Sequence, residues 1–169
     1  MAQIIHNPCM FMQKYMTGEL KQLYELTQES GREHGFFIYE DRGKIEHTPI
    51  QSGSVNNITL RMKSVFGLGI LNSGIPIATV HSHPNKEFNY LFSDTDIKTM
   101  LSSGLEFAVV VFKSSNGPRC SVYSSSKYGN FKDLKRHTVD SYFAGIPDVS
   151  EIDLVEALNN ELKLCEFKV

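Results

Sequence analysis

Short apolar strands alternate with amphipathic helices along this chain, and that alternation limits the folds open to it. Apolar or aromatic runs bounded by glycine, proline or asparagine predict the strands. Apolar residues spaced three and four apart predict the helices. Interleaved strands and helices are typical of an α/β or α+β sandwich with a mixed sheet. The predicted strands lie at 36–39, 44–48, 77–81, 106–112 and 119–124, and the predicted helices at 17–30, 56–66, 94–103, 131–143 and 151–164.

Several of these elements carry a signal for where they begin or end. Thr17 can cap the first helix, and Gly31 can end it. Asn116-Gly117 is a hairpin signal between the last two predicted strands. Ser150, three residues before an aspartate, resembles a capping box at the start of the last helix.

Length and composition indicate one globular domain. The chain has 169 residues, of which 41% are hydrophobic and 21% charged. Residues 1–16 show little periodicity and predict an N-terminal arm, which leaves 17–169 as a single domain. The net charge of −2, from 17 basic and 19 acidic residues, does not favour binding to nucleic acid or to an anionic membrane surface.

The compartment is predicted from segments that the sequence lacks. The apolar run Phe107 to Phe112 is too short to span a bilayer. The chain does not begin with a basic segment followed by an apolar one, so no secretory signal is expected. The three cysteines, Cys9, Cys120 and Cys165, are far apart, which argues against a disulfide framework and against a cysteine-based zinc site. We therefore expect a cytoplasmic protein, with export by a route that needs no such peptide as the alternative.

The segment most informative about chemistry is His81-Ser82-His83-Pro84, at the end of a predicted buried strand. Residues i and i+2 of an extended chain point to the same face, so His81 and His83 can converge on one metal ion. Asp96, in the first turn of the next helix, can supply a third ligand, and Asp94 is the competing carboxylate. Two imidazoles and one carboxylate suit one Zn²⁺ per chain, with the fourth position left to water.

A water held by such a metal needs a base. Glu33 stands between the first predicted helix and strand, close to Gly35, where backbones can approach closely. It is the first candidate, and Glu87, in the loop beside the histidines, is the rival. Ser93 lies three residues before Asp96, so it can cap the helix, place a hydroxyl at the site, or do both.

His-Ser-His-Pro, then Ser-x-x-Asp, with a glutamate earlier in the chain before a glycine and a strand, resembles the JAMM metalloprotease family, also called MPN+ or JAB. The resemblance covers Glu33 to Tyr123. It implies a cytidine-deaminase-like three-layer α/β sandwich and a bound zinc. By position it makes His81, His83 and Asp96 the ligands, Glu33 the general acid/base, and Ser93 the group that stabilises the oxyanion. The loop from Pro84 to Phe92 is longer than the family's usual spacing, and the Phe-Ser-x-x-Asp ending is closer to the toxin-associated bacterial branch.

The function expected from this resemblance is a zinc metallopeptidase or isopeptidase. Its partner would be a protein or peptide substrate, with ubiquitin-like conjugates among the candidates. Two alternatives stay open: a toxin or effector hydrolase with another target, and a non-catalytic interaction module of the same fold. The sequence predicts neither the substrate nor the oligomeric state.

Overall fold

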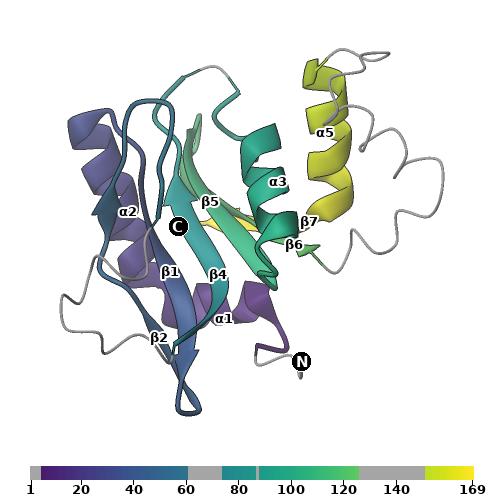
Figure 1. Ribbon diagram of the computed structural model, residues 1–169. Coiled ribbons are helices and arrows are strands. Elements are labelled where there is room, and N and C mark those ends of the chain that lie inside the picture. The colour runs from purple at the N-terminus through teal and green to yellow at the C-terminus, as the bar shows by residue number, and fades with distance from the viewer. Residues whose placement is uncertain (1–4, 61–73, 87, 126–150) are drawn as a thin grey trace.

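The computed structural model describes residues 5–60, 74–86, 88–125 and 151–169. Within these ranges a seven-stranded mixed sheet lies between two layers of helices (Figure 1). The strand order is β2-β1-β4-β5-β6-β7, with β3 also paired to β1. The β4–β5 pair is parallel and the other pairs are antiparallel. The predicted α/β architecture, a mixed sheet flanked by helices, is confirmed.

Seven strands and four helices lie in the described ranges. The strands are β1 (His34–Asp41), β2 (Lys44–His47), β3 (Gln51–Ser52), β4 (Ile75–Ser82), β5 (Phe107–Ser114), β6 (Gly117–Ser124) and β7 (Lys163–Lys168). The helices are α1 (Pro8–Tyr15), α2 (Thr17–Ser30), α3 (Asp94–Ser102) and α5 (Glu151–Leu162).

Strand alternation divides the core into two apolar layers, one on each face of the sheet. Phe107, Val109 and Val111 of β5 belong to the layer that also holds Met12 of α1 and Leu20 of α2. The intervening β5 residues Ala108, Val110 and Phe112 belong to the other layer, together with Ile97 of α3 and Leu158 of α5. Figure 1 shows α2 on one side of the sheet and α3 and α5 on the other. A strand buried on both faces needs a continuous apolar run, and β5 has one.

The predicted boundaries of the first helix are confirmed, but its predicted cap is wrong. α2 spans Thr17–Ser30 and ends at Gly31, whose φ of 68° is left-handed and suits glycine. Thr17 is the first residue of the helix rather than its cap, since Met16 takes the cap position without a side-chain bond. The Thr17 hydroxyl donates instead to the carbonyl of Gln13, 2.8 Å away.

Two elements at the ends of the chain were not predicted. Part of the expected N-terminal arm forms α1, whose Met12 is fully buried in the core. At the other end α5 stops at Leu162, and residues 163–168 pair with β6 as the edge strand β7. The last strand is short and only half buried, so its pattern gives a weak signal.

The predicted helix at 56–66 is wrong at its start, because residues 56–60 are not helical. The rest of that helix lies outside the described residues. The same holds for three other predictions: the helix at 131–143, the Ser150 cap and Glu87.

The prediction of unpaired cysteines is wrong for two of the three. Cys9 of α1 and Cys165 of β7 form a disulfide, with their Cα atoms 6.4 Å apart. The two residues are 156 positions apart in sequence, so no spacing rule could pair them. The edge position of β7 brings Cys165 to α1. Cys120 is free and buried, as expected of a small apolar residue.

No helix in the described part of the chain combines the length and the apolar character needed to cross a membrane.

Candidate metal centre

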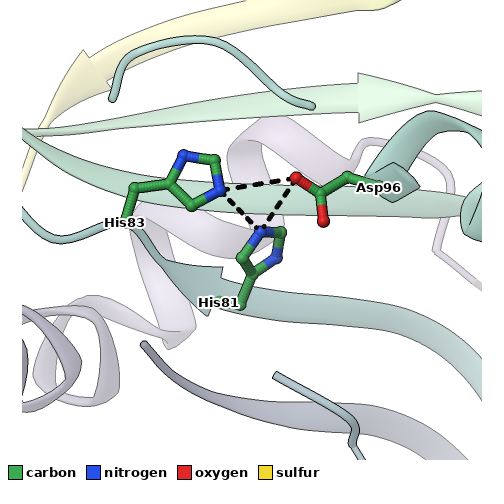
Figure 2. A group of neighbouring side chains, drawn as sticks. All are labelled: His81, His83 and Asp96. Carbon is green, nitrogen blue, oxygen red and sulfur yellow. Dashed lines mark hydrogen bonds and ion pairs between the residues drawn. The ribbon is translucent and has the colours of Figure 1, made fainter. Parts of the chain in front are cut away.

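The two histidines lie at the carboxyl end of β4, on the sheet face covered by α3. His81 is the penultimate residue of β4, and His83 follows the strand, with its amide donating to the carbonyl of Val111 at 2.9 Å. Both side chains point toward Asp96, in the first turn of α3 (Figure 2). Both histidines are buried, with 4% and 7% exposed surface. The expected same-face arrangement of His81 and His83 is confirmed.

Three ligand atoms converge at this point. The Nε2 atoms of His81 and His83 are 3.0 Å apart. Oδ2 of Asp96 lies 3.3 Å from Nε2 of His81 and 3.4 Å from Nε2 of His83. Four ligands held ~2.0–2.1 Å from a tetrahedral Zn²⁺ would lie ~3.3 Å from one another. The spacing and the donor set of these three residues therefore fit a metal ion bound between them.

Asp96, rather than Asp94, lies with the two histidines. His81, His83 and Asp96 form the group of potential ligands found among the described residues. Asp94 is the first residue of α3 and lines the neighbouring cleft, but it is not part of that group.

The protonation of His83 leaves its Nε2 available to a metal. Its Nδ1 lies 2.9 Å from the carbonyl oxygen of Asn89, and a carbonyl oxygen can only accept, so Nδ1 carries the hydrogen. In the neutral ring the lone pair is then on Nε2, which faces Asp96. A backbone carbonyl that orients an imidazole in this way is a common feature of metal sites.

Asp96 is also tied to the start of its own helix. The Ser93 amide and hydroxyl both donate to Oδ2 of Asp96, at 2.9 and 2.7 Å, and the Asp96 amide donates to the Ser93 hydroxyl at 3.1 Å. This is a capping box, so the helix-capping role of Ser93 is confirmed. The cap therefore aims the carboxylate at the histidines.

The charges in the site shift its pKa values in a consistent pattern. Burial opposes ionisation of Asp96, but His81 and His83 lower the pKa of this carboxyl well below its ordinary value. Burial also opposes a charge on His81, but the neighbouring Asp96 and Glu33 carboxylates raise its pKa overall. The site thus favours a positive charge between the three ligand atoms, from a proton or from a metal ion.

Glu33 lines the cleft at this site. It precedes β1, where its backbone pairs with the loop at residues 53–54 through the bonds Glu33 N to Ser54 O and Gly53 N to Glu33 O, both 2.8 Å. Its carboxyl is buried, and burial raises its pKa although His81 and His83 oppose the shift. It lines a cleft of about 630 Å³ together with His83, Ser93 and Asp96. The structure therefore places Glu33 at the cleft that His83 and Asp96 also line, and its role as a base stays a prediction.

Gly35 explains how β1 comes so close to β4. Gly35 is paired with His81 in the antiparallel register. A Cβ at this position would lie 2.7 Å from the Val80 carbonyl oxygen and 3.0 Å from the His81 Cβ. Only glycine fits there without moving one strand. The close pairing of β1 with β4 places Glu33, directly before β1, near the end of β4 that carries His81.

Sequence reasoning missed Lys86 in the cleft. Its ammonium donates to Oδ1 of Asn56 at 3.3 Å, and its charge lowers the pKa of Glu33. The available signal was its position, three residues after His83 in the loop that leaves the site.

No protein-family model matches this chain, and a search of curated proteins finds no significant match.

Proposed function

We propose that this chain is a zinc-dependent peptidase or isopeptidase of the JAMM type, in which His81, His83 and Asp96 hold the metal. The observation that carries the proposal is the convergence of three ligand atoms at the spacing expected around one tetrahedral ion. When bound, zinc supplies a Lewis acid that lowers the pKa of a coordinated water toward ~7 and polarises a carbonyl.

Glu33 is the proposed general base. It lines the same cleft as the ligands His83 and Asp96, and burial raises its pKa above the ordinary value, which makes the carboxylate a better proton acceptor. In this role the carboxylate takes a proton from the attacking water. The same group then returns the proton to the leaving amine of the peptide bond.

Ser93 is the proposed oxyanion donor. Its hydroxyl now donates to Asp96, and Ser93 also lines the cleft. Rotation of the hydroxyl would redirect its hydrogen to the oxygen of a substrate carbonyl. The amide of Ser93 would still bond the Asp96 carboxylate, which keeps that ligand in place.

A buried carboxyl close to the ligands favours an enzyme over a non-catalytic module of the same fold. An interaction module has no need of Glu33, and burial of this carboxyl opposes its ionised form. A costly buried ionisable group inside a cleft is typical of a functional site.

The test compares the zinc-loaded protein with the Glu33→Gln variant, which keeps the shape of the side chain but cannot accept a proton. Lysine-linked ubiquitin dimers and a mixed-sequence peptide library serve as probes, with cleavage followed by mass spectrometry. We expect cleavage by the wild type and a ~10²-fold or larger loss in the variant, with zinc content unchanged. A wild type without zinc, or a variant as active as the wild type, would contradict the proposal.

The disulfide supports a narrower candidate, an exported toxin or effector hydrolase. Disulfides such as Cys9–Cys165 are rare in reducing compartments, so the expectation of a cytoplasmic protein loses one of its supports. Thiol trapping in the producing cells tests this candidate. We expect both cysteines to be oxidised in exported material, and a chain that stays in the cytoplasm with both thiols reduced would exclude it.

A further inference from the structure

Asn159, on the C-terminal helix α5, is a buried polar residue that the proposed mechanism does not use. Its side chain is 2% exposed and makes three hydrogen bonds. Oδ1 accepts from the amide of Phe92, and Nδ2 donates to the carbonyl of Phe92, both at 2.8 Å. Nδ2 also donates to the carbonyl of Val155 at 2.8 Å. Both donors of the amide group are thus satisfied.

These bonds hold the residue directly before the site. Phe92 precedes Ser93, the cap that binds the Asp96 carboxylate. Its backbone lies before the helix and cannot use the helical hydrogen-bond pattern. Asn159 supplies a donor and an acceptor to that backbone, as a neighbouring strand would. An apolar residue here would leave a buried amide and a buried carbonyl without these partners.

The aromatic ring of Phe92 also packs against its neighbours. It stacks on Tyr123 of β6, with centroids 4.6 Å apart and planes 10° apart, and its centroid is 6.0 Å from that of His81. α5 also contributes to the cleft itself, because Val155, one helical turn before Asn159, lines it. α5 thus contacts the site in two ways. Val155 forms part of the cleft wall, and Asn159 bonds the backbone that leads to Ser93.

We infer that Asn159 is a positioning residue: by fixing the backbone of Phe92 it sets the position of the Ser93 cap, and through the cap that of the Asp96 carboxylate relative to His81 and His83. This inference rests on the proposed zinc site. It makes α5 part of the functional site although its residues are more than fifty positions away from the histidines in sequence. A group that orients a ligand in this way affects metal affinity without touching the metal.

The test measures Zn²⁺ affinity by competition with a chromophoric chelator in the full chain. Asn159→Leu removes all three hydrogen bonds at similar volume. Asn159→Asp keeps an acceptor for the Phe92 amide but, when ionised, cannot donate to either carbonyl. We expect both variants to bind zinc ~10–100-fold more weakly than the wild type, the usual cost of losing a group that orients a ligand. Amide hydrogen exchange at Ser93 and Asp96 should become faster in both.

Leu162→Ala is the matched control. Leu162 is fully buried on the same helix and belongs to the same apolar layer as Leu158, but its apolar side chain cannot hydrogen-bond the backbone of the loop before α3. We expect Leu162→Ala to lower the melting temperature at least as much as Asn159→Leu while zinc affinity stays at the wild-type value. If Leu162→Ala weakens zinc binding equally, the effect reports on stability and the inference fails.

The outcomes separate the inference from the proposal beneath it. Equal zinc affinity in the wild type and in a folded Asn159 variant overturns the positioning role alone. If Asn159→Leu does not fold, the Asn159→Asp result decides. A wild type that binds no zinc overturns the proposed function, and the inference with it.

Discussion

The end of β4 carries two clusters of polar side chains on opposite faces of one strand, and they are built differently. His81 and His83 point to the face covered by α3, whereas Ser82, between them, points to the face covered by α2. We call Glu33, His81, His83 and Asp96 the site cluster. Thr27, His34 and Ser82 form the backing cluster.

In the backing cluster the side chains hydrogen-bond one another and the neighbouring backbone. The Ser82 hydroxyl bonds the Thr27 hydroxyl, accepts from the His34 amide at 3.1 Å and lies 3.2 Å from the His34 carbonyl. Nδ1 of His34 lies 3.0 Å from the carbonyl of Arg32. All three residues are buried. A buried and internally satisfied network of this kind holds α2, β1 and β4 together.

In the site cluster the potential ligand atoms converge on one point, while Ser93 and the Asn89 carbonyl hold the Asp96 and His83 side chains from outside it. Two imidazole nitrogens lie 3.0 Å apart beside a carboxylate, and a second buried carboxyl has its pKa raised by desolvation. The convergence of these atoms fits a cation bound between them. This comparison shows that burial alone does not identify a candidate functional site, whereas the convergence of several potential ligand atoms on one point indicates one.

Among the substitutions that distinguish the two clusters, Ser93→Ala should have the largest effect, which is a loss of turnover. Loss of an oxyanion donor lowers kcat by ~10²–10³-fold. Loss of the cap also costs ~0.5–2 kcal/mol of stability. Ser93→Thr keeps both a hydroxyl and a capping group and serves as the control. Peptide cleavage, zinc content and a melting curve are measured on the same samples, and full turnover in Ser93→Ala would reduce Ser93 to a cap.

Ser82→Ala should affect the backing cluster alone. It leaves the buried His34 amide and the Thr27 hydroxyl with one partner fewer, which costs ~1–3 kcal/mol of unfolding free energy. Zinc affinity should not change, because the neighbouring strands hold the backbone of His81 and His83 through their own hydrogen bonds. Urea denaturation and zinc titration measure the two quantities. A parallel fall in zinc affinity would show that the clusters are not independent.

A smaller effect is expected on stability when Glu33 is replaced by Gln in the zinc-free protein. The folded-state pKa of Glu33 is raised, mainly by burial, so the folded state keeps this proton to a higher pH than the unfolded state does. Stability contributed by the protonated form is therefore lost as the pH rises through that pKa. Glu33→Gln should be more stable than the wild type at about pH 7, and the difference should shrink toward about pH 4. A wild type that is more stable than Glu33→Gln at about pH 7 would contradict the raised pKa of Glu33.

The parts of the molecule that local patterns determine were predictable. The His81–His83 pair, the helix that presents Asp96 and the Ser93 cap all follow from short spacings along one segment. Glu33 could be predicted because Gly35 indicates a close approach of two strands. In the structure, a Cβ added to Gly35 would clash with the Val80 carbonyl oxygen.

The features that sequence reasoning missed depend on contacts between distant parts of the chain. The Cys9–Cys165 disulfide joins a helix and an edge strand that come together only when the sheet is complete. Asn159 contacts Phe92 across 67 positions. Neither contact leaves a periodic or spaced signal in the residues around it.

The zinc content of three proteins decides whether His81, His83 and Asp96 form a metal centre. The wild type, Asp96→Ala and Asp94→Ala are loaded with Zn²⁺, dialysed and analysed by mass spectrometry for zinc per chain. Three ligands that include Asp96 predict about one zinc in the wild type and in Asp94→Ala, and none retained in Asp96→Ala. Zinc retained in Asp96→Ala, or lost from Asp94→Ala instead, would contradict the ligand assignment, and no zinc in the wild type would contradict the metal centre itself.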